Sequence, residues 1–183
     1  MSQVVDPEAI ELIPIDLPNL HRLAVCEPVD LGIIEIPDGA LPPAKVAVRA
    51  LAQLELGIPA FWCVPLLIVS KSRQSVLGGC GFKTAPTHGA VEISYGVARS
   101  ERGRGVATVA VGRLLQMAVS SGLVQEVVAH VLPRNMASSR VVARLGFLRG
   151  QPFVDTDGET VVPWVWRSQP NSSFKPTPLR GAA

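Results

Sequence analysis

The stretch VARSERGRGVATVAVGRLLQ, residues 97–116, joins a run of charged and small residues to an apolar helical pattern. Three arginines and two glycines stand within residues 99–105. From residue 107 onward, apolar side chains recur at intervals of three and four, which is typical of a helix with one buried face. The stretch therefore predicts a glycine-rich turn that leads directly into a helix.

The composition of this turn suits an anion. The first turn of a helix has backbone N–H groups without partners, and the helix dipole adds partial positive charge there. Gly103 and Gly105 allow close approach because they lack a Cβ, Arg102 and Arg104 add charge, and Thr108 adds a hydroxyl. A tight strand-to-helix connection would use the same glycines, so the turn alone leaves both interpretations open.

Two common phosphate-binding loops are excluded. The pattern GxxxxGK[ST] does not occur in the chain, and GxGxxG fails because Thr108 stands where the third glycine is needed.

The residues on both sides of the turn predict a mixed α/β fold. Strands are expected over residues 10–14, 61–70, 75–83, 90–97, 124–132 and 158–167, and helices within 16–28, 43–57, 106–120 and 133–147. Asp16 is a candidate helix cap, and Pro65 indicates an edge position or a bulge for its strand. This order gives an antiparallel meander followed by β-α-β-α-β, which requires a crossover helix.

The chain has 183 residues, of which 48% are hydrophobic and 17% are charged. This composition is typical of a folded globular protein. We expect a single domain over residues 1–167 and a flexible tail over 168–183, which is rich in Ser, Pro and Gly. A net charge of +2 is too small for nucleic-acid binding by bulk attraction. The most apolar run, from Ile58, contains two prolines and is too short to cross a membrane.

The three cysteines, Cys26, Cys63 and Cys80, form neither a CxxC motif nor a cluster with histidine. No metal site is therefore expected, and reduced thiols in a cytoplasmic protein fit best. The N-terminus lacks the basic-then-apolar pattern of a secretion signal, which favours the same compartment.

Two motifs about thirty residues apart resemble those of the GNAT superfamily of acyl-CoA-dependent N-acetyltransferases. The first is Arg-x-x-Gly-x-Ala, formed by Arg102, Gly105 and Ala107, and the second is NMASSRVVARLGF, residues 135–147, an Asn followed by a short helix that ends in Leu-Gly-Phe. The resemblance covers residues 91–149 and is closest to the ribosomal-protein N-terminal acetyltransferases. It implies a mixed, mostly antiparallel central sheet with helices on both faces and a splayed strand pair.

The resemblance further implies acetyl-CoA as co-substrate, with its pantetheine arm on the strand before the turn and its pyrophosphate on the N–H groups of the turn. The cofactor-binding residues carried over in this way are Tyr95, Val97, Arg99, Arg102, Gly103, Arg104, Gly105, Val106, Ala107, Thr108, Asn135 and Ser138. Arg140 and Arg144, one helical turn apart, are expected to be solvated, with contact to the ribose phosphate as the lesser alternative.

The implied reaction is direct attack of a primary amine, on a small molecule or a protein N-terminus, on the thioester. Glu92 is the first candidate base, and His130, whose imidazole changes charge near neutral pH, is the second. The family often places a tyrosine acid where this chain has Val142, so Ser138 is the substitute near the sulfur. In the alternative interpretations, Glu92 is an exposed strand carboxylate, His130 is structural and Ser138 caps a helix.

Two further interpretations concern the function of the whole protein. A non-catalytic acyl-CoA-binding or regulatory module on the same fold would fit the turn, and so would a different nucleotide-binding α/β domain. The acidic residues Glu27, Asp30, Glu35 and Asp38 could attract a cationic acceptor. The sequence allows a monomer or a homodimer.

Overall fold

One mixed sheet runs through the part of the molecule that the computed structural model describes, residues 6, 9–32, 35–156 and 158–168. Its strands are β1 (Ile10–Pro14), β2 (Leu66–Ser70), β3 (Ser75–Phe82), β4 (Ala90–Val97), β5 (Glu126–Val131), β6 (Leu148–Arg149), β7 (Phe153–Val154) and β8 (Thr160–Arg167). The helices are α1 (Leu17–Ala24), α2 (Ala44–Glu55), α3 (Ala60–Cys63), α4 (Val106–Ser120) and α5 (Met136–Arg144), with a 3-10 turn, η2, at Arg99–Glu101. The strand order is β1-β2-β3-β4-β5-β8-β6, and β7 pairs with β8.

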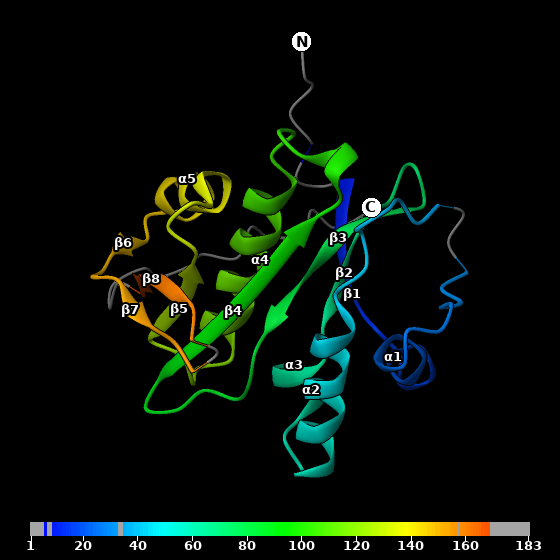
Figure 1. Cartoon of the computed structure of the whole chain (residues 1–183), viewed down its shortest axis with the longest axis horizontal. Coiled ribbons are helices and arrows are strands. Elements are labelled where there is room, and N and C mark those ends of the chain that lie inside the picture. Colours follow the sequence, from blue (N-terminus) through cyan, green and yellow to red (C-terminus); the bar gives the residue numbers. More distant parts are fainter. Residues whose placement is uncertain (1–5, 7–8, 33–34, 157, 169–183) are drawn as a thin grey trace, which may run out of the picture.

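The sheet opens between β4 and β5, the one parallel pair among the described strands. These strands pair at Ala90–Glu126, Val91–Val127 and Glu92–Val128. Pairing stops there, although β4 continues to Val97 and β5 to Val131. Figure 1 shows β4 in the middle of the molecule, with β1, β2 and β3 on one side and β5 to β8 on the other. The splayed strand pair is therefore confirmed.

Helices cover both faces of the sheet, as expected. The apolar stripe of α4, including Ala110, Val111 and Leu114, is fully buried against Ile93 of β4 and Val127 of β5. A second core joins the sheet to α1 and α2 on the opposite face through Leu20, Leu23, Ala47, Ala50 and Leu67. Since α4 connects the two parallel strands, it is the predicted crossover helix.

Local sequence signals fix the ends of the N-terminal helices. Asp16 caps α1 by accepting a 2.8 Å hydrogen bond from the Asn19 N–H, and Pro18 stands in the first turn, where a missing N–H costs nothing. Gly57, with φ of 79°, follows the end of α2 in the left-handed conformation that glycine favours. The predicted cap at Asp16 is confirmed, and the second helix ends within its predicted range, 43–57.

The strand predicted over residues 61–70 is wrong in its first half. Residues 60–63 form the short helix α3, and β2 begins only at Leu66. Pro65 stands before the first ladder residue, so its missing N–H removes no sheet hydrogen bond, and its carbonyl accepts from the Ile15 N–H at 3.1 Å. β2 lies between β1 and β3, so it is not an edge strand, but its pairing with β3 shifts register between Ile68 and Val69, which agrees with the predicted alternative of a bulge.

The C-terminal third contains two short strands that the sequence did not predict, β6 and β7, each of two residues. Both pair with β8 and extend the sheet beyond β5. Ser168 donates its N–H to the Gln125 carbonyl at 2.9 Å. The rest of the expected tail, residues 169–183, lies outside the described residues.

Candidate active site

The arginine–glycine turn has the backbone geometry expected of an anion site. Gly103 and Gly105 adopt φ of 77° and 85°, a conformation that other residues rarely accept. Gly105 is the N-cap of α4, and no side chain of the described residues caps this helix. The N–H groups of its first turn therefore have no capping acceptor, which leaves them available to a ligand.

A cavity of about 430 Å³ lies against this turn, between the end of β4, the start of α4 and α5. It is lined by Tyr95, Gly96, Val97, Glu101, Arg102, Gly103, Gly105, Val106, Ala107, Thr108, Asn135, Ala137, Ser138, Arg140, Val141 and Arg144. All the cofactor-binding residues predicted from the resemblance are in this set except Arg99 and Arg104. Arg140 and Arg144 are exposed, as expected, but they also border the cavity.

The Arg104 side chain contacts a residue of the turn and does not line the cavity. Its guanidinium lies 3.0 Å from the Glu101 carboxylate, which also receives two hydrogen bonds from Arg73, at 2.9 and 2.7 Å. Glu101 is 5% exposed, and the hydrogen bonds from Arg73 hold the pKa of its carboxyl below the ordinary range. Glu101 thus ties the turn to the β2–β3 loop. Sequence reasoning missed this role, because only the fold brings Arg73 to residue 101.

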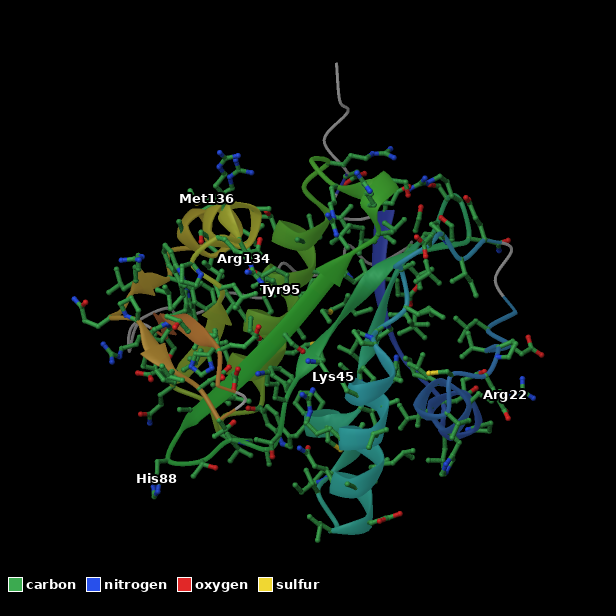
Figure 2. All side chains as sticks on the ribbon, viewed as in Figure 1. Arg22, Lys45, His88, Tyr95, Arg134 and Met136 are labelled. Carbon is green, nitrogen blue, oxygen red and sulfur yellow. The ribbon has the colours of Figure 1, made fainter. Side chains whose placement is uncertain are left out.

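The start of α5 forms the far wall of the cavity. The Asn135 side chain caps α5 by accepting from the Ser138 N–H at 3.1 Å. The Tyr95 hydroxyl donates to the Ser138 carbonyl at 3.2 Å and so crosses from β4 to α5. Figure 2 shows Tyr95 on the side of β4 where Arg134 and Met136 mark the start of that helix.

The Tyr95 side chain is a candidate for chemistry at this cavity that the sequence did not indicate. The position where the family often has its tyrosine, Val142, is fully buried one helical turn beyond Ser138. The chain's only tyrosine reaches the same helix from β4 instead. Burial raises the pKa of the Tyr95 phenol, with a smaller opposing effect of the hydrogen bond to Ser138, so the phenol is protonated at neutral pH.

The two predicted base candidates meet at the point where the sheet opens. His130 Nδ1 lies 2.9 Å from Glu92 Oε1, and the Lys83 ammonium pairs with the same oxygen. Glu92 is the last residue of β4 that pairs with β5, and His130 lies two residues beyond its partner Val128. The Phe153 ring contacts the imidazole edge-on, with centroids 5.1 Å apart.

A second groove, of about 410 Å³, borders the same end of β4. The loop before α2, Val46 of that helix, and residues of β3 and β4 line it. Tyr95, Gly96, Val97 and Arg102 border both hollows, so the end of β4 separates them. Two sites that share one strand suit a reaction between two bound substrates.

Glu92 and His130 line neither of these hollows, and the acidic residues and cysteines that the sequence offers are no better placed or suited. None of Glu27, Asp30, Glu35 and Asp38 lines either of them. Cys80 lines the second groove but is buried, and burial raises its pKa to about 12, which makes it a poor nucleophile. Among the described residues, no group of His, Cys, Asp and Glu side chains could hold a metal ion, and no helix is both long and apolar enough to cross a bilayer.

Comparison with known proteins decides the family. The sequence model of the acetyltransferase (GNAT) domain matches residues 43–148. The chain belongs to the GNAT acetyltransferase family. Among curated proteins, it is 30% identical over 83 residues to the uncharacterized N-acetyltransferase YjdG of Bacillus subtilis, and 32% identical over 81 residues to the uncharacterized N-acetyltransferase p20 of Bacillus licheniformis. These matches cover 45% and 44% of the chain, and 49% and 46% of the two relatives, so they span about half of their length.

Solved GNAT structures share the fold. The ribosomal-protein-S5-alanine acetyltransferase from Vibrio fischeri aligns with a TM-score of 0.63 at 15% identity, over 94% of this chain and 98% of that one. The acetyltransferase yncA from Salmonella typhimurium, solved with its cofactor acetyl-CoA, aligns with a TM-score of 0.57 at 16% identity, over 90% and 97%. The expected likeness to ribosomal-protein acetyltransferases is confirmed at the level of the fold.

Proposed function

We propose that this GNAT protein transfers an acetyl group from acetyl-CoA to a primary amine by direct attack in a ternary complex. The observation that carries the proposal is the uncapped start of α4, with left-handed Gly103 and Gly105, at a cavity that borders the unpaired end of β4. Residues 103–108 would hold the pyrophosphate through their N–H groups. Arg102, Arg140 and Arg144 would offset the phosphate charges.

The pantetheine arm would follow the unpaired edge of β4 toward Glu92. Beyond Glu92, main-chain groups of β4 have no partner on β5, which leaves room for hydrogen bonds to the arm. The Arg102 guanidinium donates to the Val97 carbonyl at 3.3 Å. We expect the arm to replace this contact when the co-substrate binds.

His130 and Glu92 would act together as the base. The Nδ1 atom of His130 faces Glu92 Oε1 at 2.9 Å, so Nε2 is the atom of this imidazole that can take a proton from the attacking amine. This arrangement favours His130 as the proton acceptor and gives Glu92 the role of orienting it. It refines the prediction from sequence, in which Glu92 itself was the first candidate.

Tyr95 would supply the proton that the departing thiolate needs. The N–C bond forms as the C–S bond breaks, the amine proton passes to His130, and the sulfur takes the phenol proton. Tyr95 suits this role because it borders both hollows and its pKa keeps the proton at neutral pH. Ser138, the candidate predicted from sequence, offers its carbonyl to Tyr95 and remains the alternative donor through its hydroxyl.

The acceptor is a small-molecule amine or a protein N-terminus, bound in the groove beside β4 and α2. The described cysteines, Cys26, Cys63 and Cys80, are all free, which fits a reducing compartment such as the cytoplasm. A second candidate, a non-catalytic acyl-CoA-binding module, is favoured by Val142 in the place of the family's usual tyrosine.

Two measurements separate these functions. Calorimetric titration with acetyl-CoA tests binding, and release of free thiol over a panel of amines and short peptides tests turnover. Binding with turnover supports the transferase, whereas binding without turnover on any amine supports the module. Gly105→Glu places bulk and negative charge against the expected phosphate, so it should abolish the binding heat, and retained affinity would remove the proposed site.

A further inference from the structure

A cluster of charged side chains, Arg49, Lys83, Glu92 and His130, lies next along the elements that line the groove beside α2, although none of the four lines the groove itself. Val46 of α2 lines the groove, and Arg49 lies three residues further on the same helical face. Ser94 of β4 also lines it, and Glu92 lies two residues back on the same face of that strand. Arg49 and Glu92 therefore stand where the groove approaches the opening of the sheet, beside His130.

Positive charge exceeds negative charge in this cluster. Glu92 is its one carboxylate among the described residues, and both Lys83 and His130 pair with the same oxygen of it. Arg49 also interacts with the charge of Glu92. Arg49 and Lys83 together carry one positive charge more than Glu92 can balance, and Lys45, four residues before Arg49 on α2, adds another toward that face.

Arg49 also has an unsatisfied donor. Its Nε atom is buried and, within the described part of the chain, has no hydrogen-bond partner. Burial lowers the pKa of Arg49, and the charge of Glu92 offsets part of that shift. A guanidinium is charged at every physiological pH, so a buried, unpaired N–H of this group is costly until an acceptor reaches it.

We propose that the acceptor is a small amine that carries a carboxylate, an amino-acid-like molecule, and that Arg49 binds this carboxylate while the amine faces His130. The inference rests on the proposed acetyl transfer and names its acceptor class. A carboxylate supplies the anion that balances Arg49 and Lys83 and the acceptor that Arg49 Nε lacks. A polyamine would bring a further cation toward the same two side chains, and charge repulsion disfavours it.

Matched pairs of acceptors test the carboxylate directly. Initial rates of thiol release are measured with glycine, β-alanine and 4-aminobutanoate, and with the carboxamide of each. The wild-type protein should show a kcat/KM about tenfold or more higher for at least one acid than for its amide, as a charge-assisted hydrogen bond would give. Equal values within every pair would overturn the proposal.

Substitutions test which side chain causes the preference for the acid over its amide. Arg49→Gln should raise KM for the preferred acid about tenfold and leave KM for its amide and the affinity for CoA unchanged. The preference for the acid over the amide should therefore disappear. Arg22→Gln, on α1 and well away from β4 (Figure 2), removes the same charge from an exposed site and should change nothing. If Arg49→Gln lowered the rates with the acid and with the amide equally, the result would show that Arg49 does not bind the carboxylate. The unfolding midpoints of both variants check that they are folded.

A binding measurement keeps the inference separate from catalysis. The three acids and their amides are titrated into the CoA-saturated protein by calorimetry. If an acid binds to the wild-type protein but not to Arg49→Gln, the carboxylate site is supported even when no amine is acetylated. The absence of acetylation would then contradict only the proposed transferase activity. Absence of binding for all the acids, or binding of amides as tight as that of acids, would overturn the carboxylate site while leaving acetyl transfer to amines of a different class open.

Discussion

His130 Nδ1 lies 2.9 Å from Glu92 Oε1 at the place where β4 and β5 part. The two residues come from different strands and are 38 positions apart in the sequence, yet the last paired rung of the parallel ladder brings them together. An imidazole that faces a carboxylate with one nitrogen offers the other nitrogen to an incoming amine. This relationship unites two residues that the sequence presents as competing candidates for one role.

His130→Gln should lower kcat/KM about 100-fold or more, in the range of general-base contributions, because glutamine cannot accept a proton from the attacking amine. Glu92→Gln should lower kcat less, because it keeps the imidazole. His21→Gln, an exposed substitution on α1, is the control. A His130→Gln variant with a kcat/KM near the wild-type value would show that His130 is not the base.

Tyr95→Phe should lower kcat on the order of 10- to 100-fold while leaving the affinity for CoA nearly unchanged, because it removes only the proton donor. Ser138→Ala keeps the main-chain carbonyl that accepts from Tyr95, so its kcat should stay near the wild-type value. Single-turnover kinetics with acetyl-CoA and an active amine measure both. The reverse pattern, a large loss in Ser138→Ala and none in Tyr95→Phe, would assign the acid to the serine hydroxyl.

Glu101→Gln should lower the free energy of unfolding by roughly 1–2 kcal/mol near neutral pH, a modest figure because the Arg73 side chain is 40% exposed. The folded pKa of Glu101 is depressed. Its stabilisation is therefore present above the unfolded value of about 4.3 and is lost as the pH falls through the lower, folded value. Urea unfolding at several pH values should show the difference from wild type shrinking below about pH 4.

Glu126→Gln is the matched control for that experiment. Its partner Arg167 is 71% exposed, so solvent screens the pair and the change in stability should be within about 0.5 kcal/mol. A Glu101→Gln effect no larger than that of Glu126→Gln, or one that persisted unchanged in acid, would contradict the role of Glu101 in anchoring the turn.

Local signals in the sequence predicted most of the fold. Asp16, Gly57 and the apolar stripe of α4 each act through neighbouring residues, and the structure agrees with all three predictions. The error at residues 61–70 arose because β-forming side chains outweighed Pro65 in the pattern, whereas the chain uses this proline to separate α3 from β2. The strands β6 and β7 are too short to leave a periodic signal.

The site was predictable where it depends on a motif and not where it depends on tertiary contacts. The glycine turn at Gly103 and Gly105 and the helix that starts after Asn135 were predictable because backbone conformation and helix ends are local, and their role in binding the co-substrate stays a prediction. The Arg73–Glu101 pair and the reach of Tyr95 to Ser138 join residues 28 and 43 positions apart, and no spacing rule connects them.

A crystal structure of the protein with bound CoA would show where the pyrophosphate lies. We predict that the pyrophosphate accepts hydrogen bonds from the N–H groups of residues 103–108, with the pantetheine arm running along β4 toward Glu92. A pyrophosphate bound elsewhere, without contact to the turn or to the first turn of α4, would contradict the account.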